Sequence, residues 1–167
     1  PGLTSSHHIH HMAAKAVTFA EALEFGKDYA SQTIKNAKAL ADALNDLGFK
    51  VLGEKKGFTQ SHQTVVNVLD YGDGGKIEAD LEKANIIVNR QLIPGDIKAK
   101  RHYMHPGGIR LGTSEVTRLG MKESEMGQIA SFIKSVIVDN KDTKDIAKQY
   151  EEFFDSIGLQ ICNIVFT

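Results

Sequence analysis

One arginine lies where an apolar strand pattern predicts burial. Arg110 stands between Ile109 and Leu111 in the segment HPGGIRLGTSEVTRLGM, which covers residues 105–121. Burying an unpaired guanidinium is costly, so this side chain must reach solvent, pair with a structural acid, or bind an anionic ligand. A guanidinium held on a rigid strand is well suited to bidentate capture of a small carboxylate. Arg110 is therefore the first candidate binding residue, and a surface or structurally paired arginine is the alternative.

The opening stretch PGLTSSHHIHH offers a second candidate site. The backbone N–H groups and the hydroxyls of Ser5 and Ser6 would lie at a helix N-terminus, which favours anions such as phosphate. An ordinary helix cap is the alternative. His7 and His11 share a helical face, but no HExxH pattern and no nearby cysteine accompanies them. We expect solvated or interface histidines here and no metal site.

A third candidate segment is VNRQLIPGD, residues 88–96, which leaves a strand pattern with polar side chains exposed. The amides of Asn89 and Gln91 can each donate and accept hydrogen bonds, so they could pair with a ring that carries both kinds of group. Ordinary polar loop residues are the alternative. The single cysteine and the scattered histidines form no readable nucleophile triad.

Hydrophobic periodicity predicts the elements that must position these residues. Helical spacing recurs from about His8 to Phe25, is interrupted at Gly26, and then continues to Gly48, a residue type that often follows a helix end. The later elements are expected in this order: strands over 49–52 and 64–69, a helix over 76–84, a strand over 86–88, an irregular stretch over 91–108, a strand over 109–111, a helix over 122–138 and a final helix through 146–154. Strands grouped between helices favour an α+β fold, with three or four strands covered by helices on one side.

Composition narrows the class of protein. The 167 residues include 20 Lys and Arg against 21 Asp and Glu, a balance that disfavours nucleic acid or an anionic membrane as a partner. The apolar runs are far shorter than a bilayer span. One cysteine excludes an internal disulfide and fits a reducing compartment. We therefore expect a cytoplasmic protein with no nucleic-acid and no membrane partner.

Five segments together resemble one family, the serine hydroxymethyltransferases, in the same order along the chain. They run from Pro1 to about Val138, and five ordered motifs are far more specific than any single one. The segments are PGLTSSHHIHHMAAKAVTFAEAL, QTIKNAKALADALNDLGFKVL, TQSHQTVVNVLD, ANIIVNRQLIPGD and GIRLGTSEVTRLGMKESEM.

The resemblance implies the C-terminal small domain of a pyridoxal 5'-phosphate enzyme of fold type I, an α+β domain with long helices and a small, mainly antiparallel sheet. Such an enzyme interconverts serine and glycine and passes a one-carbon unit to a reduced pterin. The resemblance assigns the substrate carboxylate to Arg110, the phosphate of the cofactor to Ser5 and Ser6, and the pterin ring to Gln91. It also implies a homodimer, because the cofactor phosphate belongs to the neighbouring subunit.

Two departures from the family pattern bear on these roles. Ser5 and Ser6 replace a pair of glycines, so contact with the phosphate must use backbone N–H groups or hydroxyls. Gln91 replaces an asparagine, and the loop that follows is longer and more basic than usual. Gln91 and this loop disfavour ordinary folate, and the motifs resemble archaeal members of the family, which suggests a modified pterin such as tetrahydromethanopterin as the carrier.

The family's Schiff-base lysine lies in a T-H-K motif that is absent from this sequence. We therefore expect the chain to be the C-terminal portion of such an enzyme, with no catalytic residue of its own and no activity alone. The expected parts are the end of the large domain at 1–25, a linking helix at 26–47, the small domain at 48–140 and a C-terminal extension at 141–167. The alternatives are another amino-acid enzyme of the same fold, such as a threonine aldolase, or a stand-alone dimerisation or interaction domain.

Overall fold

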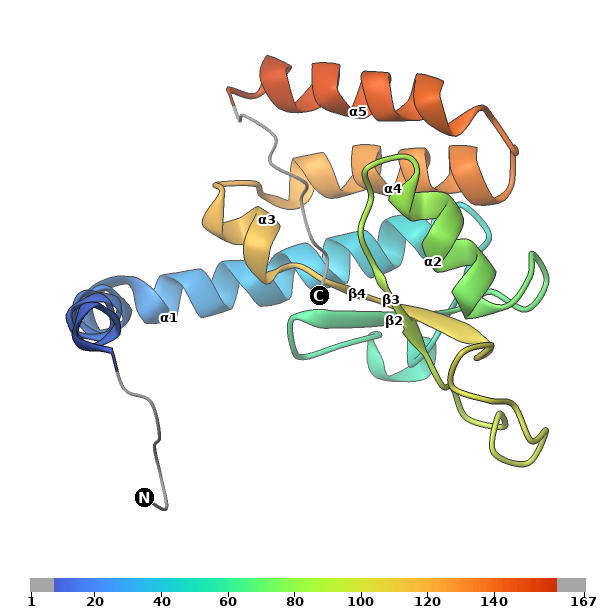
Figure 1. The fold of residues 1–167 in the computed structure, drawn as a ribbon, viewed down its shortest axis with the longest axis horizontal. Helices are drawn as coiled ribbons and strands as arrows, with labels where there is room; N and C mark the ends of the chain where they lie inside the picture. The colour runs from blue at the N-terminus through green and yellow to red at the C-terminus, as the bar shows by residue number, and fades with distance from the viewer. Residues whose placement is uncertain (1–7, 159–167) are drawn as a thin grey trace. The chain divides into compact units, whose positions relative to one another are not determined.

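The computed structural model describes residues 8–158, and the chain divides into two compact units, one ending at Ser31 and the other beginning at Gln32. Figure 1 shows the elements. In chain order they are α1 (Ile9–Asp46), β1 (Lys50–Val51), η1 (Glu54–Lys56), β2 (Gln63–Asn67), α2 (Gly74–Glu82), β3 (Asn89–Gln91), β4 (Gly108–Gly112), α3 (Ser114–Arg118), α4 (Glu123–Ile137) and α5 (Thr143–Ser156). The finer boundaries expected at residues 25/26, 47/48 and 140/141 stay predictions.

The interruption expected at Gly26 is wrong, because α1 continues through it. A glycine inside a helix costs only about 1 kcal/mol relative to alanine, and the residues around it in EALEFGKDYA include strong helix formers. In the unit that ends at Ser31, α1 leaves Met12, Phe19 and Leu23 exposed. In the unit from Gln32 onward, the same helix buries side chains at helical spacing, including Ala37, Leu40, Ala41 and Leu44.

The sheet has four strands in the order β1-β2-β4-β3, and every neighbouring pair is antiparallel. The expected α+β class and the small antiparallel sheet are therefore confirmed. The strand expected over 86–88 is misplaced, since β3 begins at Asn89. Ile86 and Val88 are buried in the core, so their apolar run marks the approach to the strand rather than the strand itself.

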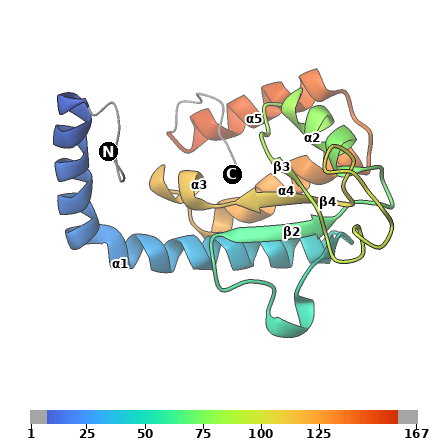
Figure 2. The ribbon, with the colours of Figure 1, turned by 60° about the horizontal axis from the view of Figure 1, so that its bottom comes forward.

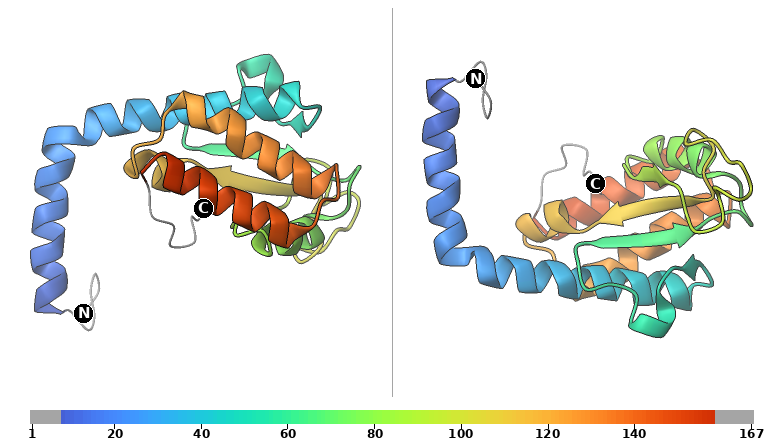
Figure 3. Two further views of the ribbon diagram at one scale, coloured as in Figure 1. Left: turned by 90° about the horizontal axis from the view of Figure 1, so that it is seen from above. Right: turned by 90° about the horizontal axis from the view of Figure 1, so that it is seen from below.

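Helices cover one face of the sheet. In Figure 3, α4 and α5 lie in front of the strands in the left view, and the strands lie in front of the helices in the right view. The burial pattern follows the two-residue period of a strand, because Thr64 and Val66 of β2 are buried whereas Gln63, Val65 and Asn67 are only half-buried. The helix-covered face therefore holds the core, and the opposite face is open.

The last helix, α5, is part of this core. Phe132 of α4 meets Tyr150 edge-on, with ring centroids 5.6 Å apart, and Tyr150 packs against Phe154 at 4.7 Å. Tyr150 and Phe154 are fully buried, and burial raises the pKa of the Tyr150 hydroxyl. Residues 143–156 thus add apolar cover to α4.

The N-terminus of α2 is held against the start of β4, as Figure 2 allows the reader to follow. The Gly74 N–H donates to the carbonyl of Pro106 at 2.7 Å. A Cβ atom on Gly74 would lie only 2.2 Å from the carbonyl oxygen of Gly108 and 3.1 Å from the Pro106 ring. Only glycine allows this close approach, which fixes the segment that leads into β4.

Replacing Gly74 with alanine should therefore destabilise the protein by about 1–3 kcal/mol or more, because the added methyl group must displace backbone atoms. Gly127 is a matched control, since it lies on the exposed side of α4 with nothing within 4 Å of an added Cβ. Gly127→Ala should stabilise by about 1 kcal/mol through helix propensity. Urea unfolding measures both changes, and equal midpoints for the two variants would contradict this packing.

Candidate functional site

Arg110 lies at the centre of β4, which runs between β2 and β3. Its neighbours Ile109 and Leu111 are buried on the helix-covered face, whereas Arg110 is half-buried on the open face. Because successive side chains of a strand point to opposite faces, an arginine can stand between two core residues without entering the core. Across the sheet, Arg110 is paired with Val65 on one side and with Asn89 on the other.

The guanidinium of Arg110 is only partly satisfied. Its Nη2 donates to Oδ1 of Asn89 at 3.0 Å, whereas its Nε is buried and has no hydrogen-bond acceptor within the described part of the chain. A buried donor left without an acceptor costs about 1–3 kcal/mol. The described residues therefore do not supply acceptors for all the N–H groups of Arg110.

The other two cations of the sheet are neutralised by acids. Lys50 forms an ion pair with Asp70 at 2.7 Å, and the guanidinium of Arg90 forms one with Glu78 of α2. Between residues 8 and 158 no carboxylate forms such a pair with Arg110. The uncompensated charge on the open face is therefore suited to an anion that comes from outside these residues.

Gln91 lies on the same open face as Arg110. It ends β3 two residues after Asn89, and its cross-strand partner is Gly108. The Gln91 Nε2 donates to the carbonyl of Leu92 at 3.0 Å. The structure thus brings two of the expected binding residues, Arg110 and Gln91, to one face of neighbouring strands.

A buried carboxylate organises the irregular stretch between β3 and β4. Asp96 is only 2% exposed, and its Oδ2 accepts hydrogen bonds from the N–H groups of Ile93 at 2.9 Å and Gly107 at 2.8 Å. Its Oδ1 lies 3.5 Å from Nε of Arg101. Asp96 therefore joins the two ends of the stretch directly beside the strand that carries Arg110.

The Pro-Gly-Gly turn lies close to this same stretch. A Cβ atom on Gly107 would lie 2.8 Å from Oδ1 of Asp96, and one on Gly108 would lie 2.4 Å from Cγ2 of Ile93. In the described structure the two glycines thus allow close packing of the loop onto β4.

The start of α2 ties down the end of the stretch. Asp73 caps this helix by accepting from the N–H groups of Gly75 at 2.9 Å and Lys76 at 3.0 Å, and Nδ1 of His105 lies 3.4 Å from its Oδ2. The hydrogen bond from Lys76, with those from His105 and Gly75, holds the pKa of Asp73 below its usual range.

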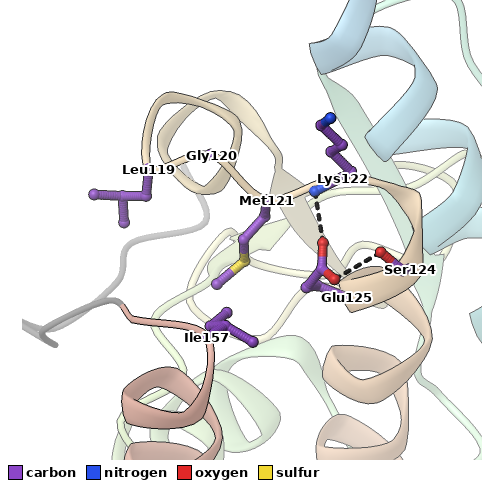
Figure 4. Close-up of a pocket in the computed structure, with 7 residues that line it drawn as sticks. All are labelled: Leu119, Gly120, Met121, Lys122, Ser124, Glu125 and Ile157. Carbon is purple, nitrogen blue, oxygen red and sulfur yellow. Dashed lines mark hydrogen bonds between the residues drawn. The ribbon is translucent and has the colours of Figure 1, made fainter.

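One cavity of about 280 Å³ lies away from Arg110, at the junction of α3 and α4 (Figure 4). Its polar groups already serve the N-terminus of α4, where Glu125 accepts from the Lys122 N–H at 2.8 Å and from the Ser124 hydroxyl at 2.6 Å. The bond from Ser124 is the main reason that the pKa of Glu125 is lowered. The Glu125 carboxylate in this cavity is therefore already used to cap α4.

The other sequence-based expectations have different outcomes. Ser5, Ser6 and His7 lie outside the described residues. The rings of His8, His10 and His11 lie close together, with centroids 4.3–5.4 Å apart, but over residues 8–158 no group of three metal-ligating side chains could hold a metal ion. In the same range, none of the helices is both long and apolar enough to span a membrane.

Comparison with known proteins agrees with the motifs. The family model described as Serine hydroxymethyltransferase matches residues 1–133. The chain belongs to this family. The resemblance inferred from the five segments is thereby confirmed.

Several relatives in this family are archaeal. The chain is 74% identical over 153 residues to the serine hydroxymethyltransferase of Nitrosopumilus maritimus (strain SCM1), covering 92% of this chain and 35% of that protein. It is 50% identical to that of Pyrococcus furiosus over 155 residues, covering 92% of this chain and 36% of that protein. The chain thus spans about a third of the length of these relatives.

The fold is similar to part of a solved structure, that of L-threonine transaldolase from Pseudomonas fluorescens in its internal aldimine state. The TM-score is 0.72 and the identity 34%, over 89% of this chain and 32% of that one. The expected fold, the small α+β domain of a fold type I enzyme, is confirmed by this likeness together with the family.

Two residues of the site were not singled out for their roles from the sequence. The sequence indicates Asn89 only as a partner for a ring, yet it is the hydrogen-bond partner of Arg110. Asp96 only ends a sequence motif, yet it anchors the loop. The pairing of Asn89 with Arg110 follows from a strand register that only the structure gives. The signal for Asp96 is an acidic residue directly after a Pro-Gly pair.

Replacing Asp96 with alanine should destabilise the protein by about 2–4 kcal/mol, because two buried N–H groups lose their acceptor. Asp96→Asn is the matched comparison and should cost much less, since its amide oxygen can still accept from Ile93 and Gly107. Urea unfolding of both variants gives the measurement. Equal losses for the two would show that the carboxylate does not act by accepting these hydrogen bonds.

Proposed function

We propose that this chain supplies the substrate-carboxylate site of a serine hydroxymethyltransferase, which interconverts serine and glycine and passes a one-carbon unit to a tetrahydropterin. The observation that supports this proposal is the guanidinium of Arg110, which has a buried Nε–H without an acceptor and no acid as a partner among residues 8–158. A planar fork of donors matches the two oxygens of a carboxylate. The α-carboxylate of serine or glycine is an anion of this kind.

The cofactor of this proposal is pyridoxal 5'-phosphate. When bound, it supplies an electron sink for the carbon that bears the amino group. From this chain, Ser5 and Ser6 would hold its phosphate, and the donor set fits, because hydroxyl and backbone N–H groups are good donors to phosphate oxygens. Arg110 would bind the carboxylate on the carbon that bears the amino group and so orient the amino acid.

The one-carbon carrier of this proposal is a reduced pterin, either a folate or a modified pterin such as tetrahydromethanopterin. Gln91 would contact its ring, because the amide can both donate and accept and lies on the open face with Arg110. Lys98 and Lys100 of the following loop are exposed cations, which suits a carrier with an anionic tail.

The remaining parts of the proposal concern the whole enzyme. It would act as a cytoplasmic homodimer, with the phosphate site of one subunit completed by Ser5 and Ser6 of the other. This chain alone would be inactive, since the T-H-K motif with the Schiff-base lysine is absent from its sequence.

A second candidate is another aldol-type amino-acid enzyme of the same fold, which the 34% identity to the L-threonine transaldolase favours. Both candidates need a carboxylate site at Arg110. Only the first needs a pterin, so conversion of serine to glycine that depends on added tetrahydropterin distinguishes them.

Arg110→Ala in the complete gene product should weaken glycine binding by about 3 kcal/mol, more than a hundredfold, because a charged bidentate contact is lost. Arg110→Lys should fail nearly as badly, since a point charge does not reproduce the fork. Isothermal titration with glycine measures both, and an unchanged absorbance of the bound cofactor shows that each variant is folded.

Gln91→Ala is the comparison variant for this experiment. It should raise the KM for the pterin and leave the affinity for glycine unchanged, because it touches only the carrier. Wild-type affinity for glycine in Arg110→Ala would refute the proposed site.

A further inference from the structure

Within residues 8–158, the Arg110 guanidinium has one hydrogen-bond partner, Asn89. Val65 and Asn89 are its cross-strand partners on the open face, on β2 and β3 respectively. Val65 has an apolar side chain and accepts no hydrogen bond, whereas Oδ1 of Asn89 accepts from Nη2 of Arg110 at 3.0 Å. Among the described residues, the guanidinium is therefore held from the Asn89 side alone.

Asn89 is itself held in place by its neighbour in the chain. Arg90 points to the helix-covered face, where its guanidinium pairs with Glu78 of α2, and its backbone N–H donates to Oε1 of the same carboxylate at 3.2 Å. This tether fixes β3 at the position of Asn89. The acceptor that Asn89 offers to Arg110 thus belongs to a rigid part of the sheet.

The chemistry of the acceptor matters as much as its position. An amide oxygen satisfies one N–H of a guanidinium and leaves its positive charge intact, whereas a carboxylate forms an ion pair that competes with any other anion. The sheet's other cations, Lys50 and Arg90, are paired with carboxylates. Among the described residues of the sheet, Arg110 is the cation whose hydrogen-bond partner is neutral, and the proposed function requires this cation to be free for a ligand.

We infer that Asn89 is a positioning residue for Arg110, which orients the guanidinium toward the substrate carboxylate without neutralising it. This inference rests on the proposed function. It assigns to Asn89 no contact with the substrate and no part in proton transfer. Its effect passes through Arg110 and concerns the carboxyl end of the amino acid only.

The test compares two ligands of the complete gene product, glycine and glycinamide, which differ only in the carboxyl group. Asn89→Ala should weaken glycine binding about tenfold, the change expected when a hydrogen bond to a charged group is removed. Asn89→Asp, which keeps the shape and adds a charge, should weaken it about a hundredfold, because the new carboxylate competes for Arg110. Neither variant should change the affinity for glycinamide more than about twofold, since that ligand lacks the anion that Arg110 binds.

Gln63→Ala is the matched control, because Gln63 lies on the same open face but is paired with Gly112 rather than with Arg110. It should leave the affinities for both ligands unchanged. Isothermal titration gives all the values, and the isosteric Asn89→Asp keeps the test valid if the alanine variant folds poorly.

Each outcome decides one point. Equal losses for glycine and glycinamide would show a merely structural role for Asn89, and wild-type glycine affinity in Asn89→Asp would show no role; either result overturns the inference. If Arg110→Ala binds glycine normally, the proposed function itself fails. If only the Arg110 variants lose glycine, the proposed function stands and the inference fails.

Discussion

The hydrogen bond from Arg110 to Asn89 is the interaction on which the site depends. It fixes a guanidinium on the open face of an antiparallel sheet and leaves its charge uncompensated by the residues described around it. Burial of a charged group without a partner is normally too costly to keep. A half-buried position at the centre of a sheet lowers that cost, because the aliphatic stem packs while part of the head stays open to a ligand.

The core, helix α2 and the loop before β4 together hold this strand in place. One face of the strand is packed by the core through Ile109 and Leu111, and its start is held by the close approach of α2 at Gly74. The loop that precedes it is closed by Asp96, which accepts from both of its ends. A binding group on a rigid strand keeps its geometry better than one on a loop. Gly74 is explained by close packing against the backbone of Gly108, and Gly107 and Gly108 by close packing against the side chains of Asp96 and Ile93.

The sequence predicted the class of the fold because period and burial agree over long segments. Apolar spacing alone predicts a helix over 122–138, a last helix through 146–154 and the strand around Arg110, close to the observed α4, α5 and β4. Five ordered motifs indicate the family. Two predictions were wrong. The break at Gly26 does not occur, because the long helix continues through a glycine of low helix propensity. The strand predicted at Ile86 begins later, because buried apolar residues can also lie outside a strand.

The site could be predicted only in part. The sequence indicated Arg110 because an arginine between two apolar residues conflicts with the strand pattern. It could not show which residue pairs with this arginine, because cross-strand register depends on loop geometry between segments 21 residues apart. Asn89 and Asp96 therefore needed the structure, while the phosphate roles of Ser5 and Ser6 rest on the family resemblance.

The most direct test of the Arg110 site is a crystal structure of the complete gene product with glycine bound. Both carboxylate oxygens of glycine should then lie about 3 Å from N–H groups of Arg110, with Asn89 still accepting from Nη2. A glycine carboxylate held by other residues, or an Arg110 paired with an acid from another part of the polypeptide, would contradict the central claim.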